Sequence, residues 1–436
     1  MTITATGDNS SASRAGQNNA LLRKRRAAEW RFKLYGKIAI GISLAFLVML
    51  FTSMISKGYM AFVQSSIKLD VVFDPAVIDP SGTRAKKDLW NANYSKLAKQ
   101  ALYKQLGVDP KNRRERRKAG KLLSSNVDIQ LRDMVVADPK IIGTTQTVWV
   151  LAHGNVDALL KGAISRETPE ERRQLNNQQV AWVDKLVSSG ALVKKFNSGL
   201  FVFGGSSQPE TAGLGVAIIG SFFMMMTVVL LAVPLGVAAA LYLQEFAKKN
   251  RWTDLIEVNI NNLAAVPSII FGLLGLAIFI NIMGLPRSAS LVGGLVLSLM
   301  TLPTIIIATR AAIAAVPPSI REAALGIGAS RMQTVFHHVL PLATPGILTG
   351  TIIGLAKALG ETAPLLMIGM VAFVINYPTT PLDSATALPV QIFMWATEAE
   401  RGFVERTAAA TLVLLAFMIT MNLLAVILRQ RLTRKW

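Results

Sequence analysis

The 436-residue chain contains no cysteine and only three histidines. Without cysteine it can form no disulfide, cysteine-ligated zinc site, iron–sulfur cluster or thiol nucleophile. It also lacks a Gly-x4-Gly-Lys-Ser/Thr phosphate loop, so it cannot hydrolyse ATP by that chemistry. His153 stands alone, which favours a structural role over a metal site. We therefore predict no catalytic residue, no metal site and no cofactor bound by this chain.

Acidic residues are scarce: 26 Asp and Glu stand against 46 Lys and Arg, for a formal net charge of +20. Such a balance can indicate nucleic-acid binding, so the positions of the charges decide the matter. The chain is 52% hydrophobic and 17% charged, with a mean hydropathy of +0.42. This is too apolar for a soluble domain and too charged for a chain buried in lipid throughout. The composition predicts membrane spans together with a polar part.

Several stretches contain no Asp, Glu, Lys or Arg and are long enough to cross the hydrocarbon core, which takes about 20 residues of helix. The first has 19 residues (38–56), longer than the usual apolar run of a signal peptide, so we interpret it as an anchor. Six spans are predicted, at 38–60, 212–243, 260–282, 290–311, 343–372 and 407–428.

Basic residues in the short loops set the orientation of such a chain. The N-terminal tail, the loops 244–259 and 310–342 and the C-terminal tail carry 18 in all, whereas the loops on the other side carry three. Both termini are therefore expected in the cytoplasm of a bacterial inner (plasma) membrane. Because this bias accounts for much of the net charge, nucleic-acid binding is not expected.

The hydrophilic stretch 64–210 lies on the outer side in this topology. The sequence predicts a strand at 67–73, helices at 84–106 and 167–188 and a hairpin at 191–203. About 140 residues of this kind can form an α+β extracytoplasmic domain with its own core. Its basic run, Lys111–Lys121, is either a solvated helix face or a surface that attracts an anionic solute or lipid headgroups. The sequence indicates no role for the domain.

The cytoplasmic stretch 317–341 reads as two short helices that meet near Gly326 and Gly328, with Pro341 ending the second. Such a helical hairpin, with apolar side chains, is suited to enter a groove on a cytosolic partner. Two capping boxes are predicted, Ser319 with Glu322 and Ser330 with Gln333.

The fifth predicted span carries two charges, Lys357 and Glu361. Entering at residue 343, the helix places Lys357 roughly 21 Å deep in a core of ~30 Å. Charges at that depth normally face a bundle interior or a water-filled cavity. They are either part of a solute path or a structural ion pair. A ridge of small residues on the same helix would let a neighbouring helix approach closely; it consists of Gly346, Gly350, Gly354 and Ala358.

The pattern Glu322-Ala323-Ala324, three residues, Gly328, then Leu340-Pro341 resembles the EAA loop of ABC-importer permeases. That loop is the coupling helix that docks on the ATPase subunit, so we name residues 317–341 the coupling segment. The stretches AKALGETAPLL (356–366) and ATALPVQIFMWA (385–396) are similar to signatures of the phosphate permease subunits, PstA. This resemblance covers roughly residues 210–430.

The expected fold is an all-α polytopic membrane protein of six transmembrane helices, five of them in an ABC-importer permease core, with the α+β domain inserted between helices 1 and 2. The expected partners are a cytosolic ATPase that binds ATP and Mg, a second homologous permease subunit, an extracytoplasmic phosphate-binding protein and membrane lipid. The predicted segments are a basic tail (1–37), the first helix (38–63), the outer domain (64–210), the permease core (211–430) and a C-terminal tail (431–436). Glu322, Ala323, Ala324 and Gly328 are assigned to ATPase coupling, and Lys357, Glu361 and Thr362 to the substrate pathway.

The expected function is an ATP-driven importer of inorganic phosphate that works by alternating access and is itself no enzyme. Two alternatives remain open: a permease for another oxyanion, and a membrane sensor with an outer ligand domain. A sensor needs a cytoplasmic output domain, whereas the longest predicted cytoplasmic segment has 37 residues. A membrane enzyme needs grouped acids, histidines or a nucleophile near an interface, and the spans contain no such cluster.

Overall fold

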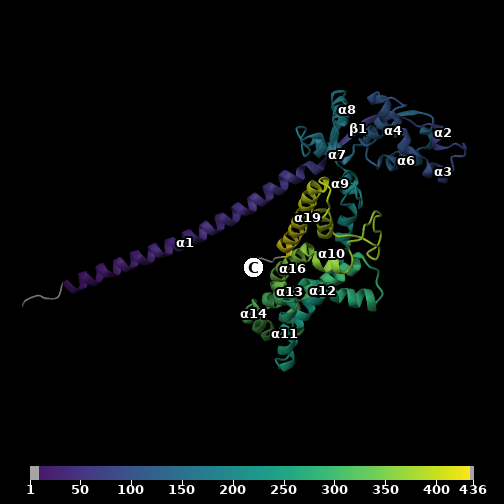
Figure 1. Cartoon of the computed structure of the whole chain (residues 1–436). Helices are drawn as coiled ribbons and strands as arrows, with labels where there is room; N and C mark the ends of the chain where they lie inside the picture. Colours follow the sequence, from purple (N-terminus) through teal and green to yellow (C-terminus); the bar gives the residue numbers. More distant parts are fainter. Residues whose placement is uncertain (1–8, 433–436) are drawn as a thin grey trace, which may run out of the picture. The chain divides into compact units, whose positions relative to one another are not determined.

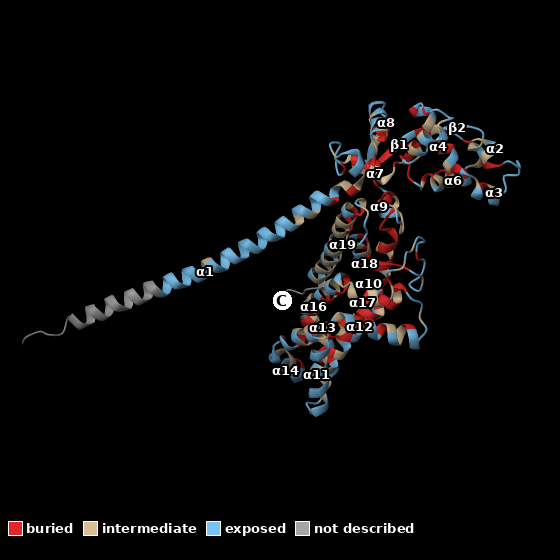
Figure 2. Ribbon diagram, in the orientation of Figure 1, coloured by how far each residue is buried: buried red, intermediate tan, exposed pale blue. Residues whose placement is uncertain are grey.

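The computed structural model describes residues 9–432, which fall into two units, one ending at Ser56 and one beginning at Lys57. Most of the first unit is α1 (Asn9–Gly58), a single long helix (Figure 1). Residues Arg25–Phe62 are long and apolar enough to cross a membrane and include the first predicted span. Large apolar side chains along α1, such as Ile40 and Phe46, are exposed (Figure 2). A helix that exposes apolar side chains is suited to lipid.

The polar stretch after α1 folds as helices around a three-stranded antiparallel sheet of strand order β2-β1-β3. The central strand pairs Ile67 with Val150 on one side and with Leu192 on the other. Alternate side chains of this strand (Ile67, Leu69 and Val71) are buried in one apolar core, as period-two strand geometry requires. The elements are η1 (Tyr59–Phe62), β1 (Val63–Val72), α2 (Pro75–Ile78), α3 (Lys86–Asn91), α4 (Tyr94–Leu106), α5 (Arg113–Gly120), α6 (Val127–Ala137), η2 (Pro139–Ile141), β2 (Thr145–Leu151), α7 (Gly154–Leu160), η3 (Glu170–Arg172), α8 (Asn177–Ser188), β3 (Leu192–Phe196), α9 (Gly199–Val202) and η4 (Pro209–Thr211).

Three local predictions in this stretch were wrong in detail. The helix expected at 84–106 is two helices, because the Asn93 side chain accepts a hydrogen bond from the Lys96 amide and starts α4 anew. The helix expected at 167–188 begins only at Asn177, after a capping box between Asn176 and Gln179. The hairpin expected at 191–203 is one strand, β3, whose partner is β1 rather than its own continuation.

Among the described residues, five helices are long and apolar enough to span a membrane, or six if one bent pair counts as a span. Besides α1, the long helices are α10 (Gly215–Leu241, extended by the π-helical turn η5, Tyr242–Phe246), α13 (Ser290–Ala314), the run Arg331–Gly360 and α19 (Gly402–Leu432). Buried residues gather along β1 and α10 (Figure 2).

The predicted span at 260–282 is not one straight helix. It comprises the end of α11 (Arg251–Ala264), α12 (Ser268–Gly275) and the π-helical η6 (Leu276–Ile282), and the axis bends by 100° between Ala264 and Ser268. Pro267 lies at this break, where it offers no amide and disfavours helical geometry in the residue before it.

The predicted fifth span, 343–372, is also not one helix. The helix α16 (Leu340–Gly360) ends where Glu361 turns to an extended conformation, and α17 (Ala363–Met367) follows. Pro364 lacks the amide that would bond to the Gly360 carbonyl, so a continuous helix here would lose that hydrogen bond. The chain then forms a loop before α18 (Leu388–Ala396).

Close packing between α13 and α16 confirms the predicted small-residue ridge. A Cβ atom built on Gly350 would lie 2.2 Å from the Cβ of Ala308, and one on Gly346 would lie 2.6 Å from the Cβ of Ala312. The two helices can therefore approach this closely only because glycine has no side chain at these positions.

Candidate functional site

The coupling segment folds as α14 (Pro318–Gly326), a turn, α15 (Arg331–Gln333) and the π-helical η7 (Thr334–Val339). Gly328 has a φ of +90°, a conformation that favours glycine, and it makes the turn. The predicted capping box of Ser330 with Gln333 is confirmed. The one predicted for Ser319 and Glu322 is wrong, because α14 starts after Pro317 with no side-chain cap.

Pro341 does not end the second helix as predicted. The helix runs on from Arg331 to Gly360, and Pro341 lies in the first turn of α16, directly after η7. A π-helical turn widens the helix, which accommodates a residue that has no amide to donate. The coupling segment is therefore continuous with the helix that carries Lys357.

The outward face of the coupling segment is apolar and open. Leu325 is 51% exposed, Ile327 82% and Met332 58%. Of the residues assigned to coupling, Glu322, Ala323 and Gly328 are exposed, whereas Ala324 is buried. An apolar patch of this kind is typical of a surface that docks on another protein.

The inward side of the coupling segment is fastened to the membrane helices by residues that sequence reasoning missed. Arg321 forms an ion pair with Glu245 at 2.8 Å and donates to the carbonyls of Ile313 and Val316. Arg331 donates to the Glu245 carbonyl. No local pattern joins these residues, since 76 positions separate Glu245 from Arg321.

The three residues assigned to the substrate pathway lie at the end of α16. Lys357 is exposed, in the last turn of the helix, whereas Glu361 and Thr362 are half-buried in the break that follows. Within residues 9–432, neither Lys357 nor Glu361 takes part in an ion pair. The structural ion pair, one of the two alternatives for these residues, is therefore not formed.

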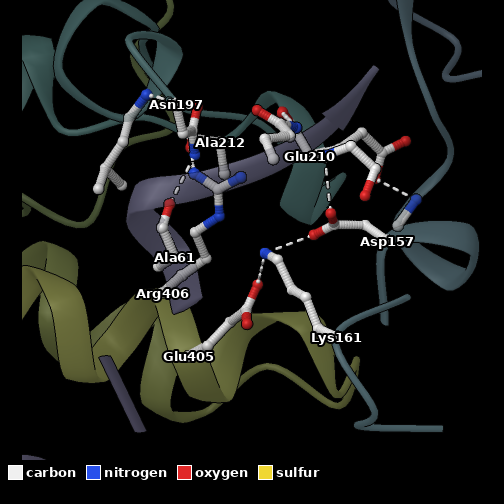
Figure 3. A network of polar contacts seen from close by, with 12 residues as sticks. Ala61, Asp157, Lys161, Asn197, Glu210, Ala212, Glu405 and Arg406 are labelled. Carbon is white, nitrogen blue, oxygen red and sulfur yellow. Dashed lines mark hydrogen bonds and ion pairs between the residues drawn. The ribbon is translucent and has the colours of Figure 1, made fainter. Parts of the chain in front are cut away.

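A second charged cluster joins α7 and the ends of the polar stretch to α19 (Figure 3). The Lys161 ammonium lies 2.5 Å from Asp157 and 2.7 Å from Glu405, and its side chain is only 1% exposed. Arg406, also buried, donates to the Ala212 carbonyl, and the Glu210 carboxylate accepts from the Gly154 amide. A buried charge costs several kcal/mol unless it is paired, so this arrangement must stay closed.

Comparison with known proteins finds two family matches in this chain. The family described as binding-protein-dependent transport system inner membrane component matches residues 232–436, and a domain of unknown function (DUF3333) matches residues 19–170. "Phosphate transport system permease protein PstA 1" of Mycobacterium tuberculosis (strain CDC 1551 / Oshkosh) is 33% identical over 52% of this chain and 74% of its own length.

Two further matches differ in coverage and in identity. "Probable ABC transporter permease protein YqgI" of Bacillus subtilis (strain 168) is 36% identical over 37% of this chain, which spans 55% of that relative. A solved structure of the MetNI methionine ABC transporter in inward-facing conformations aligns with a TM-score of 0.40 at 18% identity, over 51% of this chain and 95% of its own.

The chain therefore belongs to the binding-protein-dependent inner membrane components, the permease subunits of ABC importers. Within that family it is a PstA-like permease. It is a multi-pass membrane protein and a transport subunit rather than an enzyme.

Proposed function

We propose that this chain is a transmembrane subunit of an ATP-driven importer of inorganic phosphate, with both termini in the cytoplasm of a bacterial inner membrane. The likeness to phosphate permeases supports the substrate, and the bias of basic residues in the loops supports the orientation. A separate ATPase binds ATP and Mg²⁺. A second, similar permease subunit completes the pathway, and an extracytoplasmic binding protein delivers phosphate.

The exposed apolar face of the coupling segment is the observation that carries this proposal. Leu325, Ile327 and Met332 are exposed, and they lie in the motif that resembles an ATPase-docking loop. A groove on the ATPase would cover these side chains, as in other helix-in-groove contacts. Movement of the second half of the docked segment then passes directly into α16, because residues Arg331–Gly360 form one continuous helix.

In this scheme α16 presents Lys357 to the solute. The small-residue ridge holds one face of the helix against α13, whereas Lys357 is exposed. A free ammonium group attracts a phosphate oxyanion. Glu361 and Thr362 follow in the helix break, where the backbone is irregular, and such breaks at membrane depth line cavities or protein interiors.

The docking proposal is tested by cysteine labelling, because the native chain has no cysteine. Ile327→Cys should react with a maleimide in the isolated subunit and become protected when the ATPase is added. Trp252→Cys is the matched control: this residue is 74% exposed on α11, outside the coupling segment, and should react under both conditions. Equal reactivity of Ile327→Cys with and without the ATPase would contradict docking.

The pathway is tested by uptake of radiolabelled phosphate in cells that lack the native chain. Lys357→Gln should lower uptake, and Lys357→Gln with Glu361→Gln should not restore it, because neither residue has its function in pairing with the other. Arsenate, sulfate and molybdate as competitors distinguish phosphate from other oxyanions. Normal uptake by a double variant that still binds its ATPase would refute the pathway assignment.

A further inference from the structure

Glu245 contacts both halves of the coupling segment. It lies in η5, the π-helical turn that extends α10. Its carboxylate Oε1 accepts hydrogen bonds from Arg321 Nη2 at 2.8 Å and Nε at 3.2 Å, and Arg321 belongs to α14. Its backbone carbonyl accepts from Arg331 Nη2 at 2.5 Å, and Arg331 begins α15. A single residue at the end of α10 therefore holds the segment on both sides of its turn.

Arg321 extends this attachment to a second membrane helix. Its Nη1 donates to the Val316 carbonyl at 2.7 Å, and its Nη2 donates to the Ile313 carbonyl at 2.9 Å. These carbonyls lie at the end of α13, where a helix leaves its acceptors unsatisfied and favours a cation. One guanidinium group thus connects α14 to both α10 and α13.

The backbone offers no rigid route between α14 and these helices. Pro317 separates α14 from α13, and the turn at Gly328 separates α14 from α15. A displacement of α14 therefore reaches α10 and α13 through side chains, whereas continuous helix joins α16 only to α15, beyond the turn. The Arg321 and Glu245 side chains are 23% and 10% exposed, so the pair is shielded but not sealed from water.

We propose that Glu245, Arg321 and Arg331 form a latch that transmits movement of the docked coupling segment to α10 and α13. The proposal rests on the proposed function, because it assumes that an ATPase moves α14. Glu245 is a positioning residue that touches neither ATP nor phosphate. The latch separates docking, which uses the outward face of α14, from transmission, which uses its inward face.

Glu245→Gln tests the latch in the full transporter with its ATPase. The substitution removes the charge that holds Arg321 and leaves the backbone carbonyl that holds Arg331. The ATPase should co-purify as with the wild type and hydrolyse ATP, while phosphate imported per ATP falls at least about fivefold, the lower end of typical coupling effects. Unchanged phosphate import per ATP would overturn the proposal.

Glu257→Gln is the matched control. Glu257 pairs with Arg310 at 2.6 Å between α11 and α13, with side chains 35% and 23% exposed, and does not belong to the coupling segment. Glu257→Gln, like Glu245→Gln, removes one carboxylate from a partly exposed pair. Because this pair lies outside the coupling segment, phosphate import per ATP should stay at the wild-type value. An equal loss in both variants would show that any broken pair at this end of the bundle has the same effect, and the latch would be refuted.

A conservative substitution separates transmission from a purely structural role. Glu245→Asp keeps the carboxylate charge that faces Arg321 and should retain at least half of the phosphate imported per ATP that Glu245→Gln loses. If Glu245→Gln does not accumulate in the membrane, Arg321→Lys, which keeps the charge without the forked geometry, takes its place. Loss of ATPase binding in these variants would assign Glu245 to docking and refute the latch. A wild-type chain that binds no ATPase would instead refute the proposed function itself.

Discussion

Charged residues join polar parts of the chain to the apolar helices at two places, and the two joints differ in burial. Lys161 lies between Asp157 and Glu405 with its side chain 1% exposed, whereas Arg321 and Glu245 remain partly open to water. Opening the Lys161 joint would leave charges buried without partners, which costs several kcal/mol. Water can solvate a partly exposed pair as it opens. We infer that the first joint is permanent and that the second can rearrange during a transport cycle.

Breaking the Lys161 joint should have the largest effect. Lys161→Met leaves two carboxylates without their cation, and we expect the free energy of unfolding to fall by about 3–5 kcal/mol. Thermal unfolding in detergent measures the loss. Arg166→Ala is the control, since the Arg166–Asp184 pair is 55% and 46% exposed and should contribute less than about 1 kcal/mol. Similar losses in the two variants would contradict the distinction between the joints.

A bulky side chain between α13 and α16 should have the next largest effect. Gly350→Val places its Cβ 2.2 Å from the Ala308 Cβ, so α13 and α16 must separate, at a cost of about 1–3 kcal/mol or more. Gly360→Ala, whose Cβ meets no atom within 4 Å, is the matched variant and should be nearly neutral. Melting temperatures of the two purified variants, each compared with the wild type, measure this difference in stability.

Strain in the coupling turn should have a smaller effect on stability and a visible effect on binding. Gly328→Val forces a β-branched residue to a φ of +90°, which costs about 1–2 kcal/mol or distorts the turn. We expect ATPase co-purification to fall while the chain still inserts. Gly326→Ala is the control, because Gly326 lies in α14 with no positive φ and with open space at its Cβ. Equal co-purification of both variants would contradict the role of the turn.

The smallest expected effect concerns the loop between α17 and α18. The Thr379 hydroxyl and the amides of Thr379 and Thr380 donate to Asp383, and these bonds lower the pKa of its carboxyl to about 2. A carboxyl with a lowered folded pKa stabilises the fold above its unfolded pKa of about 3.9, and this contribution is lost as the pH falls towards 2.

Asp383→Asn should therefore flatten the dependence of the melting temperature on pH between about 4 and 2, and it should lower the melting temperature more at pH 7 than at pH 2. Thr379→Val keeps the carboxylate and removes one donor, so it should give an intermediate slope. A slope identical to the wild type in Asp383→Asn would show that this carboxyl does not couple to folding.

Much of the helical framework could be predicted from the sequence because lipid imposes a simple local rule. Charges are excluded from the spans, so uncharged stretches located the helices, and the spacing of Gly346 and Gly350 gave the face that packs on α13. The rule failed at Pro267 and Glu361, where an uncharged or nearly uncharged stretch contains a break. Apolarity shows that a segment suits lipid but not that its helix is continuous.

The candidate site was predictable only in its local parts. The capping box at Ser330 and the positive φ of Gly328 depend on residues a few positions apart, and both were within reach of sequence reasoning. The Arg321–Glu245 pair was not, because any of many arginines could have met any of many acids. The absence of a Lys357–Glu361 pair was likewise hidden, since it depends on where α16 ends.

The sequence by itself determined where apolar helices form and where polar stretches interrupt them, because these follow from hydropathy and from contacts between near neighbours. Only the tertiary structure decided which charges meet. Lys161 and Glu405 are 244 positions apart, and Glu245 and Arg321 are 76 apart. An ion pair depends on distance and on exclusion of water, and both arise only when separate elements pack together.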